Sequence, residues 1–234
     1  MIKTRKTCGR KADVQDKDKV QTLPCAPLPP QLRVDDRSVL EPSVHPVRND
    51  VKSLRKPRGG FWTSTYDPGY GFGWVRYCVA YRYTDPFELC WTVLSVAGSA
   101  RVAIIDSAED LKGLIDRYPR IVRRRRGLDF ERLSMDYDGL HLTHDGYLRT
   151  RSRRPRPPLI GWDCESTVWF RWVFTDLHEV QPYFKNADRF YDMWLHLPGW
   201  STEDYRCHRM PEDRASKKVY NTMLREMAVE SDRT

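Results

Sequence analysis

The stretch that most constrains the fold spans residues 161–170 and reads GWDCESTVWF. It places the carboxylates of Asp163 and Glu165 inside a run that is otherwise mainly aromatic and apolar. Side chains of a β-strand alternate between its two faces, so an extended conformation would point Asp163, Glu165 and Thr167 the same way. Burial of a carboxylate is costly unless partners satisfy it. We therefore expect a strand that carries two functional acids.

Glu165 is the main candidate for chemistry. A carboxylate that faces a pocket can accept a hydrogen bond from a sugar hydroxyl and stabilise an oxocarbenium-like transition state. Asp163 could share hydrogen bonds or take a second role, and a like charge so close would raise one of the two pKa values. The alternative is a structural ion pair between the acid and an arginine such as Arg151 or Arg171.

A second short strand is expected over residues 61–66, FWTSTY, between Gly59-Gly60 and an Asp-Pro-Gly turn. Aromatic rings can stack on a flat ligand, and hydroxyls can orient a carboxylate. The alternative is that Thr and aromatic residues are simply good strand formers. The candidate binding residues on this strand are Trp62, Thr63, Ser64, Thr65 and Tyr66.

The rest of the chain mixes strands and helices without a regular βαβ alternation, which favours an α+β fold with a largely antiparallel sheet or a split pair of sheets. Ser107 and Asp129 are expected to cap two helices. Strands are expected at 91–95 and 101–106, joined by a hairpin-like link at 97–99. One helix should follow Ser107 and stop at Pro119, and a second should follow Asp129 and run through Met135. After these we expect a half-buried strand at 138–143, a turn at 145–146 with 147–150 returning antiparallel, and helices at 183–195 and 215–229.

Residues 1–40 are poor in large apolar residues and rich in Lys, Arg, Asp and Pro. Such a segment buries too little surface to offset the entropy of ordering, so we predict a disordered tail. The remaining residues, 41–234, are enough for a single domain.

The charge is uneven. Charged residues make up 31% of the 234-residue chain, its formal net charge is +8, and arginines gather at Arg123–Arg126 and within Arg149–Arg156. Basic clusters favour polyanionic partners, so both segments could contact nucleic acid; the alternative is two solvated loops.

The six cysteines show no CxxC pairing and no close Cys/His spacing, so no metal site is expected. No segment has the apolar length of a leader or a membrane span. We expect reduced thiols, no membrane partner, and a cytoplasmic protein of a bacterium or of an infected host.

Several short motifs follow one another between residues 44 and 175, and their order is what links them to a known family. They are His45, the GGFWTS run at 59–64, RVAIID at 101–106 with its following helix, YDGLHLT at 137–143 and the Asp-Cys-Glu segment at 163–165. Together they resemble the ADP-ribosyltransferase-like family, notably its divergent phage and bacterial members.

The resemblance implies an α+β, mostly antiparallel split β-sandwich with peripheral helices around a central cleft that holds NAD. The family breaks the nicotinamide–ribose bond and passes ADP-ribose to an acceptor, here a macromolecule. Carried over by position, Glu165 would stabilise the ribosyl transition state and Asp163 would be the first acid of the acidic-x-Glu motif. The remaining positions bind NAD: His45 at the ribose, the hydroxyls of Thr63, Ser64 and Thr65 as support, and Trp62 or Tyr66 near nicotinamide.

The chain departs from the family pattern where Pro46 follows His45 and where Asp163 stands in place of the usual Glu or Gln. Glu131 competes with Glu165 for the catalytic role, but we expect it to lie on a helix and face solvent. The alternative functions are a non-catalytic, basic nucleic-acid-binding protein and a viral structural or interaction protein.

Overall fold

The computed structural model describes residues 28–36, 40–54, 56–67, 73–81, 84, 86–151, 159 and 161–182. Within them lie a seven-stranded sheet, a two-stranded hairpin and four α-helices. The strands are β1 (Gln31–Asp35), β2 (Phe61–Thr65), β3 (Cys90–Val96), β4 (Val102–Ile105), β5 (Pro119–Val122), β6 (Arg125–Leu128), β7 (Gly139–Leu142), β8 (Ser166–Trp169) and β9 (Phe174–Val180). The helices are α1 (Gly73–Tyr81), the 3-10 turn η1 (Pro86–Glu88), α2 (Ala108–Arg117), α3 (Phe130–Asp136) and α4 (His144–Arg151).

The large sheet has the strand order β4-β7-β8-β2-β1-β3-β9 and does not close into a barrel. Its strand pairs are antiparallel except β4 and β7, which run parallel. The predicted α+β class with a mostly antiparallel sheet is therefore confirmed.

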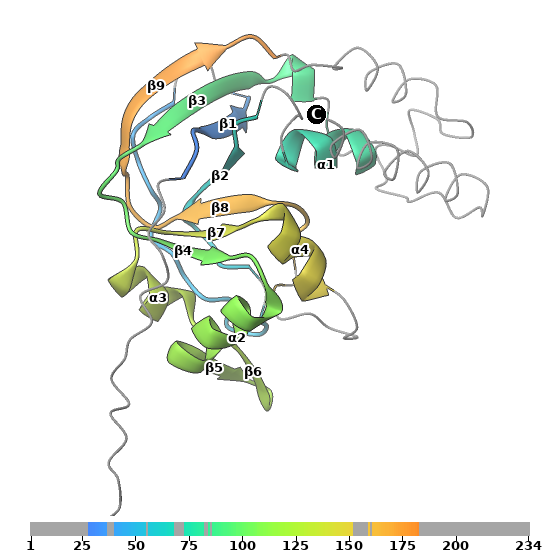
Figure 1. Ribbon diagram of the computed structural model, residues 1–234, viewed down its shortest axis with the longest axis vertical. Helices are drawn as coiled ribbons and strands as arrows, with labels where there is room; N and C mark the ends of the chain where they lie inside the picture. Colours follow the sequence, from blue (N-terminus) through green and yellow to red (C-terminus); the bar gives the residue numbers. More distant parts are fainter. Residues whose placement is uncertain are drawn as a thin grey trace, which may run out of the picture.

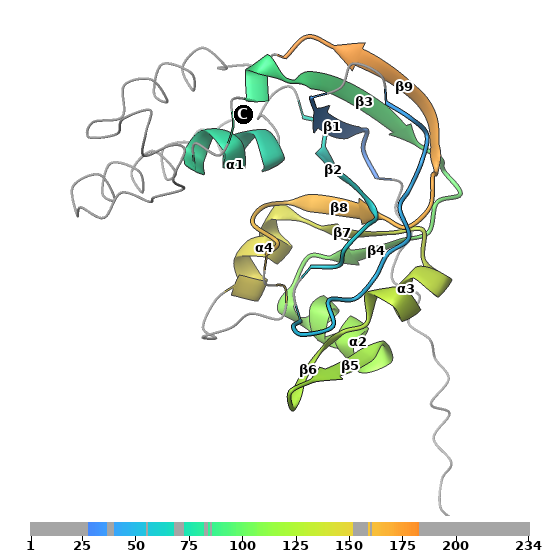
Figure 2. The same ribbon diagram turned by 180° about the vertical axis from the view of Figure 1, so that it is seen from behind.

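Strand β2 connects the two halves of this sheet. Its first part pairs with β8, from Phe61 opposite Trp169 to Thr63 opposite Thr167. Its second part pairs with β1, where Ser64 lies opposite Leu32. Figures 1 and 2 show β1, β3 and β9 on one side of β2 and β4, β7 and β8 on the other. The hydroxyl-rich segment of β2 thus lies where the sheet passes from one half to the other.

The helices pack on the sheet through apolar faces. Leu111, Leu114 and Ile115 of α2 join Ile105 of β4 and Leu140 of β7 in one buried cluster. Val75 of α1 packs in a second cluster with residues of β1 and β3. Both caps expected from the sequence are confirmed: the Ser107 side chain accepts the Asp110 N–H in a capping box, and the Asp129 side chain accepts the Arg132 N–H.

The sequence placed residues 31–35 in the disordered tail, but they form β1, an inner strand of the sheet. Both edges of β1 are paired, with β2 and with β3, and Leu32 is fully buried. A five-residue strand that lies between two others needs few apolar residues of its own, because the neighbouring strands pair its backbone N–H and C=O groups and shield them from water. The disorder predicted for residues 1–27 and the helices predicted at 183–195 and 215–229 lie outside the described residues.

Two predicted connections are wrong. Strands β3 and β4 flank the link at 97–99 but do not pair; β3 pairs with β1 and β9, and β4 with β7. Residues 147–150 do not return as a strand but belong to α4, because the Thr143 side chain accepts the Gly146 N–H and starts a helix. A Cβ on Gly146 would lie 2.0 Å from the Ile105 carbonyl oxygen, so this helix start packs directly on β4.

Two strands also differ in detail from their prediction. Strand β7 is buried at all four positions instead of alternating, because β4 and β8 flank it and helices cover its outer face. The strand expected to begin at Trp162 begins only at Ser166, after a turn in which Gly161 has φ +86°. Asp163 and Glu165 therefore precede the strand and do not share a strand face.

Candidate active site

Glu165 lies at the end of the segment that leads into β8, with 8% of its surface exposed. Its Oε1 accepts hydrogen bonds from the Thr65 backbone N–H and from the Thr65 hydroxyl, both at 3.0 Å. The Gly73 N–H, at the first residue of α1, donates to the same carboxylate. The carboxylate is thus bound between β2 and a helix N-terminus, where the helix dipole favours negative charge.

Gly73 is required by this close approach. A Cβ at this position would lie 2.6 Å from both the Glu165 backbone oxygen and its Oε2. Helix α1 consequently covers the carboxylate, and a larger residue at its first position would push the two apart.

Burial raises the pKa of Glu165 to about 7, against the opposing effect of the hydrogen bonds from Thr65 and Gly73. The alternative of an ion pair with Arg171 is excluded, because that guanidinium binds Asp138 with Nη1 and Oδ1 2.6 Å apart. The side chain of Arg151 lies outside the described residues. Among the described side chains, the ionisable partner of Glu165 is His141, whose Nδ1 is 3.7 Å from Oε1.

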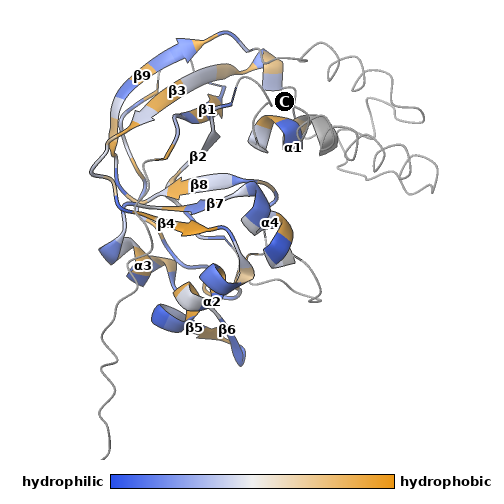
Figure 3. Ribbon diagram, viewed as in Figure 1, coloured by the Kyte–Doolittle hydropathy of each residue, from blue (hydrophilic) through white to orange (hydrophobic). Residues whose placement is uncertain are grey.

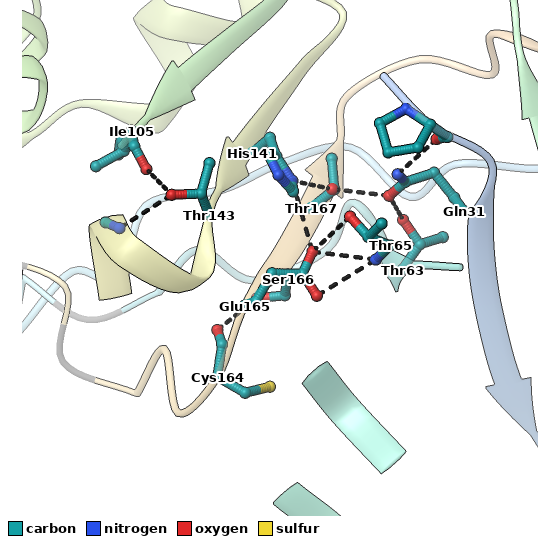
Figure 4. A network of polar contacts seen from close by, with 12 residues as sticks. Gln31, Thr63, Thr65, Ile105, His141, Thr143, Cys164, Glu165, Ser166 and Thr167 are labelled. Atoms are coloured by element: carbon teal, nitrogen blue, oxygen red, sulfur yellow. Dashed lines mark hydrogen bonds and ion pairs between the residues drawn. The ribbon is translucent and has the colours of Figure 1, made fainter. Parts of the chain in front are cut away.

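A chain of buried polar groups extends from His141 into the sheet (Figure 4). Nδ1 of His141 lies 2.8 Å from the Thr167 hydroxyl, which donates to Gln31 Oε1 at 2.8 Å. The same Gln31 oxygen accepts the Thr63 hydroxyl at 2.8 Å, and that hydroxyl accepts the Trp169 Nε1–H at 2.8 Å. Four strands, β1, β2, β7 and β8, contribute to this network.

The network fixes the tautomer of His141. The Gln31 amide is oriented by its Nε2, which donates to the Pro29 carbonyl at 3.0 Å, so its Oε1 can only accept. The single proton of the Thr167 hydroxyl is used on that oxygen, so His141 Nδ1 must carry a proton and donate to Thr167. Burial lowers the pKa of His141 to about 4, and the ring is neutral at pH 7.

A cavity of about 260 Å³ opens next to Glu165, between β1, β2, α1 and the segment that precedes β8. It combines three indole rings, two cationic side chains and one carboxylate. Its lining residues are Leu32, Arg33, Val34, Lys56, Trp62, Thr63, Ser64, Trp74, Gly161, Trp162, Asp163, Cys164 and Ser166.

Two polar atoms at this cavity have no hydrogen-bond partner in the part of the chain that the structure describes. They are Ser64 Oγ and Trp162 Nε1, on residues that are 1% and 3% exposed. Buried polar groups are nearly always paired, so an unpaired hydroxyl and an unpaired indole N–H on two residues that line one cavity are donors that a bound molecule could satisfy after a local shift, since neither atom is exposed in the present arrangement.

The two cationic side chains that line the cavity, Arg33 and Lys56, differ in their contacts. Arg33 is anchored, because its guanidinium donates to the Trp62 carbonyl at 3.0 Å and forms an ion pair with Asp35. Lys56 Nζ lies 5.4 Å from the ring centroid of Trp62, within cation–π range, and makes no ion pair with a described carboxylate. Lys56 is therefore the cation available to an anionic group.

The structure brings most of the predicted site residues together. Glu165 contacts Thr65, as expected if the two residues belong to one site. Asp163, Trp62 and Ser64 line the adjoining cavity. Thr63 directs its hydroxyl into the buried network. Glu165 itself is not among the lining residues, although its neighbours on both sides are.

Two predicted residues lie elsewhere. His45 is exposed, and its backbone carbonyl accepts the Gly60 N–H at 2.8 Å. Tyr66 is not among the residues that line the cavity and packs against the cluster of Leu32 and Trp91. The competitor Glu131 lies on α3 as expected, but it is half-buried and accepts the Asn49 N–H at 2.9 Å.

Gln31, Arg33, Lys56, Trp74 and His141 were missed as site residues. Gln31 and Arg33 were assigned to the tail, although the alternation of QLRVD was a usable strand signal. The His141 position was noted in a strand, but nothing in the sequence shows that two other strands bring Gln31 and Thr167 to it.

The described residues contain no group of three or more His, Cys, Asp or Glu side chains that could hold a metal ion. None of the described helices is long and apolar enough to cross a membrane. Comparisons with models of protein families, with curated proteins and with solved structures found no match to this chain.

Proposed function

We propose that the protein is a mono-ADP-ribosyltransferase that takes NAD into the cavity beside Glu165. One observation carries the proposal: a buried carboxylate that has no arginine partner among the described side chains is held by the TST segment of β2, next to a cavity with unpaired polar atoms on its lining residues. The split sandwich that this activity implies would open at β2, where the strand changes partners from β8 to β1.

Groups on the lining residues could bind parts of NAD. The indoles of Trp62, Trp74 and Trp162 offer faces for a flat ring, and the unpaired Ser64 hydroxyl and Trp162 N–H could bind its carboxamide. Lys56 could bind a phosphate oxygen as a point charge.

In the reaction, the bond between the ribose C1′ and the nicotinamide nitrogen breaks, and nicotinamide leaves with the electron pair. A nucleophile of the acceptor then bonds to C1′ and releases a proton. Glu165, ionised, would stabilise the positive charge that develops on the ribosyl group. For this the carboxylate must exchange its Gly73 contact for the substrate, because α1 covers it in the present arrangement.

The test compares the wild type with Glu165→Gln on NAD labelled in its adenylate half. Glutamine keeps the size of the side chain, and its single amide oxygen can still accept from Thr65, while its NH2 group cannot accept from Gly73 and the charge is lost. We expect nicotinamide release and label transfer to fall at least about 100-fold, the usual effect of removing one transition-state contact.

The matched control is Glu131→Gln, which neutralises a half-buried carboxylate away from the cavity that also accepts a backbone N–H, from Asn49. We expect this variant to retain wild-type turnover. NAD that is neither bound nor consumed by the wild type, or consumption that persists undiminished in Glu165→Gln, would overturn the proposal.

A further inference from the structure

Strands β5 and β6 form a hairpin whose two connecting residues are both arginines in the left-handed region. Arg123 has φ +48° and Arg124 has φ +63°. A two-residue turn with two positive φ values favours Asn-Gly, because residues with a bulky side chain are disfavoured there. The hairpin therefore carries arginine at two positions where the backbone favours other residues, and this suggests a use for the side chains.

The tip of the hairpin is a concentrated positive charge. All four residues Arg123–Arg126 are exposed, and the hairpin contains no acidic residue. Arg126 pairs with Asp116 at 2.8 Å, whereas the other three form no ion pair with any described carboxylate. Ile121, on the adjoining strand, is 73% exposed, so an apolar side chain accompanies the cations.

The base of the hairpin is anchored to the domain. The Arg120 guanidinium donates to the backbone carbonyls of Asp50 and Ser53. A Cβ on Gly127 would lie 2.7 Å from Leu54, so the strand packs closely on that loop. Figures 1 and 3 show that the turn points away from the large sheet and is coloured as hydrophilic. The arginines are thus presented on a fixed support.

We propose that this hairpin is a DNA-binding arm that inserts its tip into the major groove of duplex DNA. The groove is about 12 Å wide and admits a two-stranded β-ribbon. Guanidinium groups bind phosphate oxygens in a bidentate manner, and Ile121 could contact an apolar base edge such as the thymine methyl group.

The composition of the hairpin favours a duplex over a single strand. Proteins that bind single strands stack bases on aromatic side chains, and residues 119–128 contain none. The inference does not rest on the proposed NAD chemistry, since it needs only binding.

The test is fluorescence anisotropy of a labelled duplex of about 20 base pairs at several salt concentrations, with the double variant R123N/R124G. This variant removes two charges and installs the pair that the turn favours, so its melting temperature should not fall. The slope of log K against log salt is negative, and each lost phosphate contact makes it less steep by about 0.9, so its magnitude should fall by about 1.8. The affinity at about 0.1 M salt should drop at least tenfold.

The control variant R101Q/R132Q removes two exposed charges from other elements and should change the affinity less than twofold. An unlabelled single strand and polyglutamate should compete poorly with the duplex. The proposal is overturned if the turn variant binds as tightly as the wild type, if the control loses as much affinity, or if either competitor displaces the duplex at an equal concentration.

Discussion

Thr65 and Glu165 are joined twice, although 100 positions separate them in the chain. The Thr65 backbone N–H and the Thr65 hydroxyl both donate to Glu165 Oε1 at 3.0 Å. The second half of β2 is thereby tied to the segment that leads into β8, at the place where β2 turns from β8 to β1. The candidate site is built on this junction.

Gly73→Ala should destabilise the protein, because the added Cβ would lie 2.6 Å from Glu165. We expect the free energy of unfolding in urea to fall by about 1–3 kcal/mol, the range typical of overpacking. The control is Gly113→Ala in α2, where nothing lies within 4 Å of the added Cβ. That change should leave stability unchanged or raise it by up to about 1 kcal/mol, since alanine favours helix. Equal effects of the two changes would contradict the close contact.

Ser64→Ala and Thr63→Val should differ in their effect on stability, because the Ser64 residue lines the cavity whereas the Thr63 hydroxyl belongs to the buried hydrogen-bond network. The Ser64 hydroxyl has no described partner, so its removal should cost less than about 0.5 kcal/mol of stability. The Thr63 hydroxyl is bonded to Gln31 and Trp169, and its loss should cost about 1–3 kcal/mol by leaving them unpaired. Urea unfolding measures both. Under the proposed function, Ser64→Ala should also raise KM for NAD.

Glu165 should make the protein less stable as the pH rises from about 4.5 to about 7. Burial raises its pKa from 4.5 to about 7, so in this window the folded state holds a proton that the unfolded state has lost. The contribution is complete below pH 4.5 and is lost above about pH 7. Unfolding free energies of Glu165→Gln across this range should lack that decline; a parallel curve for variant and wild type would refute the assignment.

His141 should have the opposite effect on stability: its contribution to the free energy of unfolding should rise with pH between about pH 4 and pH 6.5. Burial lowers its pKa from 6.5 to about 4, so the unfolded state binds a proton that the folded state does not. Its contribution is complete above pH 6.5 and is lost as the pH falls through about 4. The two slopes oppose each other between pH 4.5 and 6.5, and His141→Gln should therefore steepen the decline that Glu165 causes there. A flatter profile for His141→Gln would count against a neutral ring.

Helix caps and several strands could be predicted from the sequence, because their determinants lie within a few residues of one another. Ser107 and Asp129 cap helices by bonds to residues three positions on, and the FWTST segment forms a strand from residues with high strand propensity. The choice of Glu165 as the acid to examine also came from local context, a carboxylate in an apolar run.

Only the tertiary structure decided which of these pieces meet. Strand β1 exists because β2 and β3 pair with both its edges, and its Gln31 reaches Thr167 across 136 positions of the chain. The cavity, the tautomer of His141 and the cover that α1 places on Glu165 arise from the same long-range contacts. Local sequence patterns predict hydrogen bonds between residues that are close in the chain. Burial and strand pairing depend on residues that are distant in the chain, and no local pattern identifies them.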